Sequence, residues 1–275
     1  MVAATFLALG SAALHAAWNL LVKTSADRLL AAWGQFLVGG LLFLPLLPLV
    51  GVPGASTLPF LACSSLVHVL YVVALTRAYK HGDFSFAYPL ARGAGALLAA
   101  IGGVLFLADS LPPLAWLAIA IVVGGLASLV RPQVGRIALL WAGLTAATIG
   151  VYTTLDAAGA RRSSGFGYGI AITLGAGLAL TVAMLASRST ARIGPALRRE
   201  WRRYLVGGVC STLAYSMVLA GARLAPVGYV AALRESSVVL GAGAGWLFLH
   251  KRLGRARLAS ATVVTTGLVL LIVWR

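Results

Sequence analysis

Ten apolar segments of about twenty residues, separated by short polar or charged stretches, make up most of this 275-residue chain. A helix rises about 1.5 Å per residue, so each segment is long enough to cross the roughly 30 Å hydrocarbon core of a bilayer. Open strands would leave backbone groups unpaired in lipid, and helices are therefore expected. The ten helices are predicted near residues 2–22, 30–50, 58–79, 84–107, 112–130, 137–156, 166–186, 204–224, 226–249 and 256–274.

The composition supports a membrane environment, because 60% of the residues are hydrophobic and only 10% are charged. A soluble domain carries about 25% charged residues. The net charge of +16 is typical of nucleic-acid-binding proteins, but here the basic residues stand in short clusters between apolar segments, so no nucleic-acid partner is expected. There is no GxxxxGK[ST] phosphate loop, and Cys63 and Cys210 do not have metal-ligand spacing. We therefore expect no cofactor, no metal and no enzymatic activity.

The two halves of the chain resemble each other. Moving residues 78–129 forward by 142 positions aligns Arg92 with Arg234 without a gap, and a shift of 134 aligns Trp18 with Tyr152. The pattern predicts two copies of a five-helix unit, and an odd number of spans per copy turns the second copy upside down in the membrane. The predicted fold is an all-α integral membrane protein with ten transmembrane helices in two inverted five-helix repeats. The repeats would cover residues 1–132 and 133–275.

The basic residues are divided unequally between the two sides of the membrane. Of the 22 lysines and arginines, sixteen fall on the side reached after the first helix and four on the side of the termini. The positive-inside rule places the richer side in the cytoplasm. Ten spans would then leave both termini outside, in the periplasm.

The remaining two basic residues, Arg92 and Arg234, lie inside predicted spans. A charged side chain at the centre of a bilayer costs at least about 2.5 kcal/mol, so it needs a partner, a wet cavity or an anionic ligand. Two hypotheses remain open: the arginines lock helices together, or they bind a substrate through the planar fork that suits carboxylate and phosphate. Glu235 is a candidate ion-pair partner of Arg92, and it is also a candidate for proton coupling.

Further polar and aromatic side chains share helix faces with these arginines. His15, Trp18 and Asn19 lie on one face of the first helix, where a polar stripe should face the bundle, and His15 is a second candidate for proton coupling. The third helix presents His68 and Tyr71 in the same way. The candidate substrate-binding residues are His15, Trp18, Asn19, His68, Tyr71, Tyr88, Arg92, Tyr152, Tyr215, Arg234 and Glu235.

Three motifs resemble the EamA group of the drug/metabolite transporter superfamily: HAAWN at 15–19, AYPLARG at 87–93 and AALRESSV at 231–238. The likeness is strongest to a subgroup with HAxWN, YPLxRG and LREsS motifs, some members of which are associated with phosphonate use. It implies a secondary transporter of the bacterial inner membrane. We expect it to export a small anionic or zwitterionic metabolite, such as an amino acid, by alternating access. Protons are a candidate coupling ion. The expected partners are that metabolite and the bilayer, for a monomer or homodimer. EamA helices often end in Gly-Glu, where this chain has Asp109 in the first copy and His250-Lys251 in the second.

Two other functions remain open. Exporters of cationic drugs, like the small multidrug resistance proteins, hold their cation with a carboxylate in the first helix, where this chain has His15 and no acid. A non-transporting accessory subunit would use the two arginines only for folding or assembly. The resemblance implies cytoplasmic termini, whereas the charge distribution favours periplasmic ones, and we follow the charges.

Overall fold

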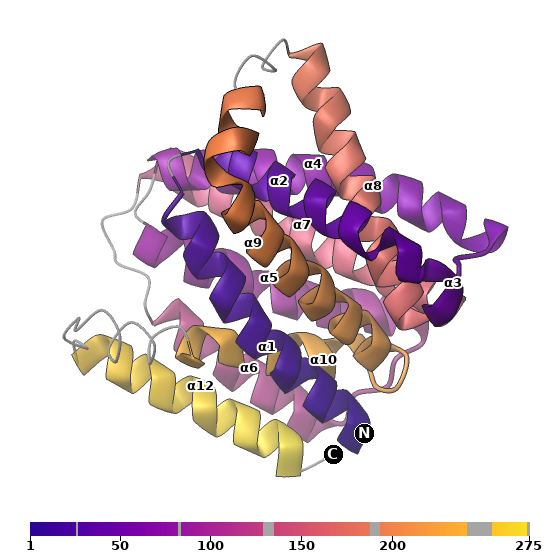
Figure 1. The fold of residues 1–275 in the computed structure, drawn as a ribbon. Helices are drawn as coiled ribbons and strands as arrows, with labels where there is room; N and C mark the ends of the chain where they lie inside the picture. The colour runs from indigo at the N-terminus through magenta and orange to yellow at the C-terminus, as the bar shows by residue number, and fades with distance from the viewer. Residues whose placement is uncertain (26, 82–83, 129–134, 188–192, 241–254, 274–275) are drawn as a thin grey trace.

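The structure is a computed structural model that describes residues 1–25, 27–81, 84–128, 135–187, 193–240 and 255–273 (Figure 1). The side chains of residues 84–88, Tyr88 among them, are outside the described part, and so is the predicted boundary between residues 132 and 133. Every element in the described part is an α-helix or a short 3-10 helix. The all-α prediction is therefore confirmed for these residues.

The first half of the chain forms α1 (Val2–Lys23), α2 (Arg28–Phe43), η1 (Leu44–Leu46), α3 (Leu47–Val50), η2 (Ala55–Thr57), α4 (Leu58–His81), α5 (Phe84–Leu107) and α6 (Pro113–Ala127). The second half forms α7 (Arg136–Arg161), α8 (Gly165–Ala186), α9 (Ile193–Ala222), α10 (Val227–Arg234) and α12 (Arg255–Val273).

Each of the ten predicted segments overlaps a helix where the structure describes it, but residues 241–249 of the ninth lie outside the described part. Within the described part, six helical stretches are long and apolar enough to cross a membrane: 28–50, 55–81, 89–107, 136–161, 165–186 and 193–222. The helix α6 has only 15 residues, and α1 carries polar side chains at Ser11, His15 and Asn19. The protein is thus a multi-pass membrane protein, and the full number of ten spans stays a prediction.

The helices α7 and α9 extend beyond their predicted bounds, and two other predicted helices are divided in the structure: 30–50 into α2, η1 and α3, and 226–249 at Glu235, directly after the end of α10. The helix α7 runs to Arg161 instead of residue 156, because three of the four residues at 157–160 are alanine, the best helix former, and none is proline. The helix α9 begins at Ile193 instead of residue 204, with a kink at Glu200, where φ is −117° and ψ is 15°. The first difference matters for the site, since it places Asp156 inside a helix and not at its end.

Local sequence explains where several helices begin and how closely they pack. The Asp27 side chain accepts hydrogen bonds from the backbone amides of Leu29 and Leu30 and so caps α2. Gly39 on α2 faces Gly208 on α9 so closely that a Cβ atom at Gly39 would lie 2.6 Å from the Gly208 carbonyl oxygen. Small residues therefore bring α2 against α9, as in many membrane helix pairs.

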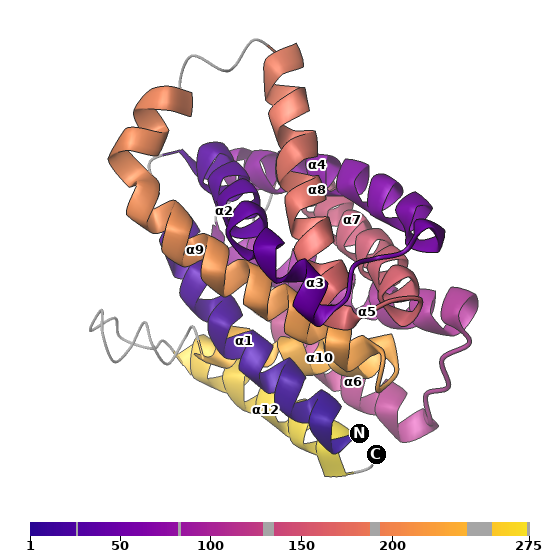
Figure 2. The ribbon, with the colours of Figure 1, turned by 45° about the vertical axis from the view of Figure 1, so that its right-hand side comes forward.

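The helix contacts occur in pairs. Three contacts of one half have a counterpart in the other (Figures 1 and 2). The contact of α1 with α9 corresponds to that of α7 with α4, and the contact of α2 with α9 corresponds to that of α8 with α4. The contact of α1 with α10 corresponds to that of α7 with α5. Three further contacts, α2 with α8, α5 with α10 and α6 with α12, join helices at equivalent positions of the two halves. The start of α1 lies beside the end of α12 in both views. This pattern is the one that a two-fold relation between five-helix units would produce.

Candidate functional site

Arg92 and Arg234 both point into the interior of the bundle, where they are 5% and 8% exposed. They come from α5 and α10, the two helices that meet at equivalent positions of the two halves. Side chains from α1, α4, α7 and α9 surround them. The site therefore lies at the junction of the first and second halves of the chain.

Arg92 forms an ion pair with Glu235 across this junction. The Arg92 Nη2 donates to Glu235 Oε1 at 2.6 Å, and its Nε donates to Oε2 at 3.2 Å, so both carboxylate oxygens are engaged. The two side chains are 6% and 2% exposed. Of the two roles considered for Glu235, the structure shows the ion pair with Arg92.

Arg234 has different neighbours. Its Nη2 donates to Nδ1 of His15 at 3.0 Å, and its Cζ atom lies 5.6 Å from the centroid of the Tyr215 ring, in the geometry of a cation–π contact. An arginine can only donate, so His15 Nδ1 accepts and His15 Nε2 must carry the imidazole proton. Arg234 Nε and His15 Nε2 are both buried without a hydrogen-bond partner in the described part of the chain. Two N–H donors thus lie in the interior with no acceptor.

Four aromatic side chains form a cluster beside the arginines. The His68 ring lies 4.2 Å from the Tyr152 ring, and the Tyr71 ring lies 5.4 Å from it at an interplanar angle of 73°. Tyr215 completes the cluster, 6.2 Å from Tyr152 and 6.1 Å from His68. These rings come from α4, α7 and α9, so residues far apart in the sequence meet as the shared-face pattern predicted.

Asp156 is a functional candidate that was not among the predicted site residues. Its side chain is fully buried and accepts hydrogen bonds from the hydroxyls of Tyr215 and Tyr168, the latter at 3.3 Å. The Ser64 hydroxyl also interacts with it. The signal was present in the sequence, because Asp156 and Glu235 are the two acids within the predicted apolar segments, but Asp156 was the last residue of its segment.

A narrow cavity of about 30 Å³ lies next to this cluster, between α1, α2 and α4. Such a volume holds a water molecule and not a metabolite. Trp18 and Asn19 line it together with Tyr71, and residues near the ends of the same helices, such as Arg28 and Tyr79, line its other part. Trp18 also packs edge-on against His15 at 4.7 Å. All the residues that line this cavity belong to the first half of the chain.

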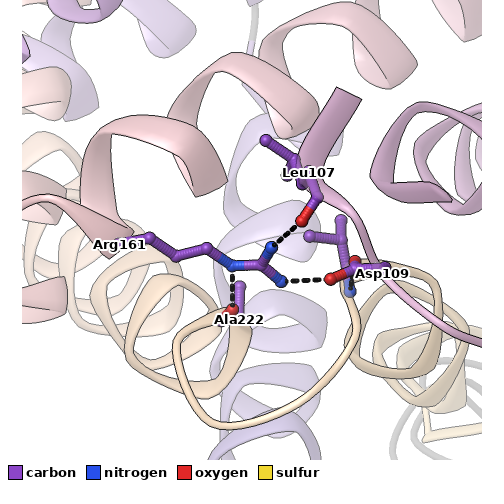
Figure 3. A network of polar contacts seen from close by, with 5 residues as sticks. Leu107, Asp109, Arg161 and Ala222 are labelled. Carbon is purple, nitrogen blue, oxygen red and sulfur yellow. Dashed lines mark hydrogen bonds and ion pairs between the residues drawn. The ribbon is translucent and has the colours of Figure 1, made fainter. Parts of the chain in front are cut away.

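The opposite end of the bundle is closed by a network around Arg161, the last residue of α7 (Figure 3). Its guanidinium donates to the backbone carbonyls of Ala222 at 2.9 Å and Leu107 at 3.2 Å, and to the Asp109 carboxylate at 2.6 Å. Asp109 in turn accepts from the backbone amide of Val227 at 2.7 Å. The network joins the ends of α5, α7 and α9 to the start of α10, and it links the two halves of the chain.

The structure brings together most of the predicted site residues. One connected cluster contains His15, His68, Tyr71, Arg92, Tyr152, Tyr215, Arg234 and Glu235. Trp18 and Asn19 lie at its edge, on the cavity, and the Tyr88 side chain is outside the described part. Tyr168 and Arg161 were missed: Arg161 falls in the loop predicted after residue 156, and Tyr168 belongs to none of the motifs on which the site was predicted. No group of three or more metal-ligating side chains occurs among the described residues.

Comparisons with known proteins agree with this architecture. A family model described as the EamA-like transporter family matches residues 136–273. Twenty-eight chains of solved structures are similar, among them a crystal structure that aligns with 99% of this chain and 99% of its own length, with a TM-score of 0.78 and 14% sequence identity. At that identity the likeness shows a shared fold. No curated protein matches the sequence.

Proposed function

The chain belongs to the EamA-like transporter family, a part of the drug/metabolite transporter superfamily, and from that premise we propose that it moves a small anionic or zwitterionic metabolite across the bacterial inner membrane. The carboxylate, phosphonate or phosphate of the substrate binds Arg234 and His15. The aromatic rings of Tyr71, Tyr152 and Tyr215 contact its remaining part.

The observation that carries this proposal is the pair of buried donors without an acceptor, Arg234 Nε and His15 Nε2. Arg92 is neutralised by Glu235, whereas Arg234 has no ion-pair partner in the described part of the chain. An unpaired charge inside a membrane protein is costly, and an anionic ligand would offset that cost. The site therefore favours a negative group over a positive one.

Alternating access is supported by the contrast between the two ends of the bundle. The Arg161 network fastens the end where α5, α7 and α9 finish, while the narrow cavity extends toward the end where α1 and α4 finish. The paired helix contacts support ten spans in two inverted repeats that rock against each other. In our proposal the cavity end faces the cytoplasm, the termini face the periplasm, and the transport direction is export.

The two alternatives have less support. An exporter of cationic drugs needs an accessible carboxylate, but both Glu235 oxygens are engaged by Arg92, and Asp156 is fully buried with its oxygens hydrogen-bonded to Tyr168 and Tyr215. A scaffold without transport activity would have no use for buried donors that lack an acceptor. Neither alternative accounts for Arg234.

The test is a ligand screen on the purified protein in lipid nanodiscs, followed by flux measurements in proteoliposomes. The panel contains amino acids, alkylphosphonates and lipophilic cations, and binding is read as an increase in the unfolding temperature. We expect an anionic or zwitterionic compound to stabilise the wild type and the Arg223→Ala control, since Arg223 is an exposed arginine. Loss of a charge-assisted contact weakens binding by about 10- to 150-fold, so Arg234→Ala should lose this stabilisation.

Each alternative predicts a different result in the same experiment. Stabilisation by lipophilic cations alone would favour a drug exporter. No ligand and no flux, together with loss of folding in Arg234→Ala, would favour a scaffold.

A further inference from the structure

Asp156 differs from the other buried acids in its surroundings. Glu235 pairs with Arg92 and Asp109 pairs with Arg161, but Asp156 has no ion-pair partner in the described part of the chain. Its side chain is fully buried, and its partners are the neutral hydroxyls of Tyr215, Tyr168 and Ser64. A buried charge without a counter-charge is costly, whereas a protonated carboxyl with hydroxyl partners is not.

Among the described residues, no lysine or arginine contacts Asp156. The helix α4 contributes His68, Tyr71 and the exposed Cys63, α8 contributes Tyr168, and α9 contributes Tyr215.

The nearest cations are held by other groups. Arg92 on α5 is engaged by Glu235, and Arg234 on α10 is engaged by His15 and by the face of Tyr215. On α7 itself, Tyr152 lies one turn before Asp156, and Arg161 is bound to Asp109.

Tyr215 connects Asp156 to the candidate anion site. Its ring lies under the Arg234 guanidinium, and its hydroxyl donates to the Asp156 carboxylate. Only the Tyr215 side chain separates Asp156 from Arg234, so the charge of Asp156 changes the electrostatic potential at Arg234. Protonation of Asp156 removes one negative charge, so the net charge of the site rises by one unit and the binding of an anion is favoured.

We infer that Asp156 is the proton-binding group of this transporter, and that its proton and the anion at Arg234 favour each other's binding through Tyr215. The carboxylate takes its proton from water when the site is open to one side and returns it to water on the other side. Proton binding by Asp156 stands by itself, while its coupling to transport rests on the proposed function. Glu235 and His15 are weaker candidates, because each is hydrogen-bonded to a guanidinium that opposes an added proton.

The test is an infrared pH titration of the protein in nanodiscs, which needs no transported substrate. We expect a pH-dependent carbonyl band of a protonated carboxyl in the wild type, absent in Asp156→Asn and kept in the control Asp109→Asn. The control makes the same change at a buried acid that is ion-paired. Should Asp156→Asn not fold, Tyr215→Phe serves instead, because it keeps the acid and removes one hydrogen bond, and we expect the band to change its frequency.

The result separates this inference from the proposed function. A titrating band that survives in Asp156→Asn, a wild type without such a band, or a band that Tyr215→Phe leaves unchanged would overturn the inference. A band that belongs to Asp156, together with a ligand screen without any hit, would uphold the proton site and refute the anion substrate.

Discussion

The buried ion pair between Arg92 and Glu235 gives the sharpest prediction, through the variant Glu235→Gln. Both oxygens of Glu235 accept from Arg92, and the two side chains are 6% and 2% exposed. Removing one partner of a buried pair costs about 3–5 kcal/mol, because the other charge is left uncompensated. Glutamine keeps one acceptor oxygen, so we expect the lower end of this range. A loss of about 3 kcal/mol lowers the ratio of folded to unfolded protein roughly 150-fold.

A double variant shows whether the charge is the cause. Arg92→Met combined with Glu235→Leu removes both charges and fills the site with apolar side chains of similar size. Replacing a buried pair in this way is often neutral or stabilising, so we expect the double variant to lie within about 1 kcal/mol of the wild type. The assay is reversible unfolding in mixed micelles, measured for the wild type, Arg92→Met, Glu235→Leu and the double variant that combines these two changes. The four values give the coupling free energy of the pair.

The reasoning fails if Glu235→Gln loses less than about 1 kcal/mol, which is the size of an exposed ion pair. It also fails if the losses of the two single variants add up in the double variant. In either case Arg92 would be hydrated and would need no counter-charge from Glu235.

Three more predictions concern other contacts and use the same unfolding assay. Arg161→Ala removes an ion pair and two hydrogen bonds to backbone carbonyls from a side chain that is 25% exposed. We expect the free energy of unfolding to fall by about 1–2 kcal/mol, and to stay unchanged in the Arg223→Ala control. Equal values for both variants would show that the Arg161 network does not hold the helix ends together. Ala108 has a φ of 56°, and Ala108→Gly should raise the unfolding temperature by about 2 °C as this strain is relieved; a lower temperature would contradict it. Gly39→Val places side-chain atoms against the backbone of α9 and should cost at least about 2 kcal/mol, whereas an unchanged stability would show that α2 and α9 can separate freely.

The sequence was informative where a charged group stood well inside a long apolar segment. Arg92, Arg234 and Glu235 were recognisable because charges are costly in lipid, and all three are buried in one cluster. His68 and Tyr71 were recognisable from their spacing on one helix face. Helix positions also followed from apolar length, since every predicted segment overlaps a helix where it is described.

Other features depend on tertiary contacts that no local pattern contains. Tyr204 is only 3% exposed because its ring lies against Gly34 of α2. Its burial depends on the missing side chain of a glycine about 170 positions earlier in the chain. Arg161 was placed in a loop because its charge was taken as the end of the membrane segment. Only the fold brings Leu107, Asp109 and Ala222 to its guanidinium.

The acids of the site do not follow the proposed repeat, whereas its cations do. Arg92 and Arg234 occupy equivalent positions at a shift of 142 residues, but the position equivalent to Glu235 is Gly93. At the shift of 134 residues that aligns Trp18 with Tyr152, the position equivalent to Asp156 is Val22. Both acids are therefore found in the second half alone.

This asymmetry determines which arginine is available. Glu235 neutralises the arginine of the other half, Arg92, and Arg234, its own neighbour in the chain, has no carboxylate partner among the residues that the structure describes. Asp156 lies on the side of Arg234, joined to it by Tyr215. A transport cycle needs its two halves to exchange positions, but a small metabolite has no two-fold symmetry of its own. Under the proposed function, a pair of equivalent arginines made unequal by two acids meets both requirements, because the two proposed repeats stay alike while one arginine is left to bind the anionic group of the substrate.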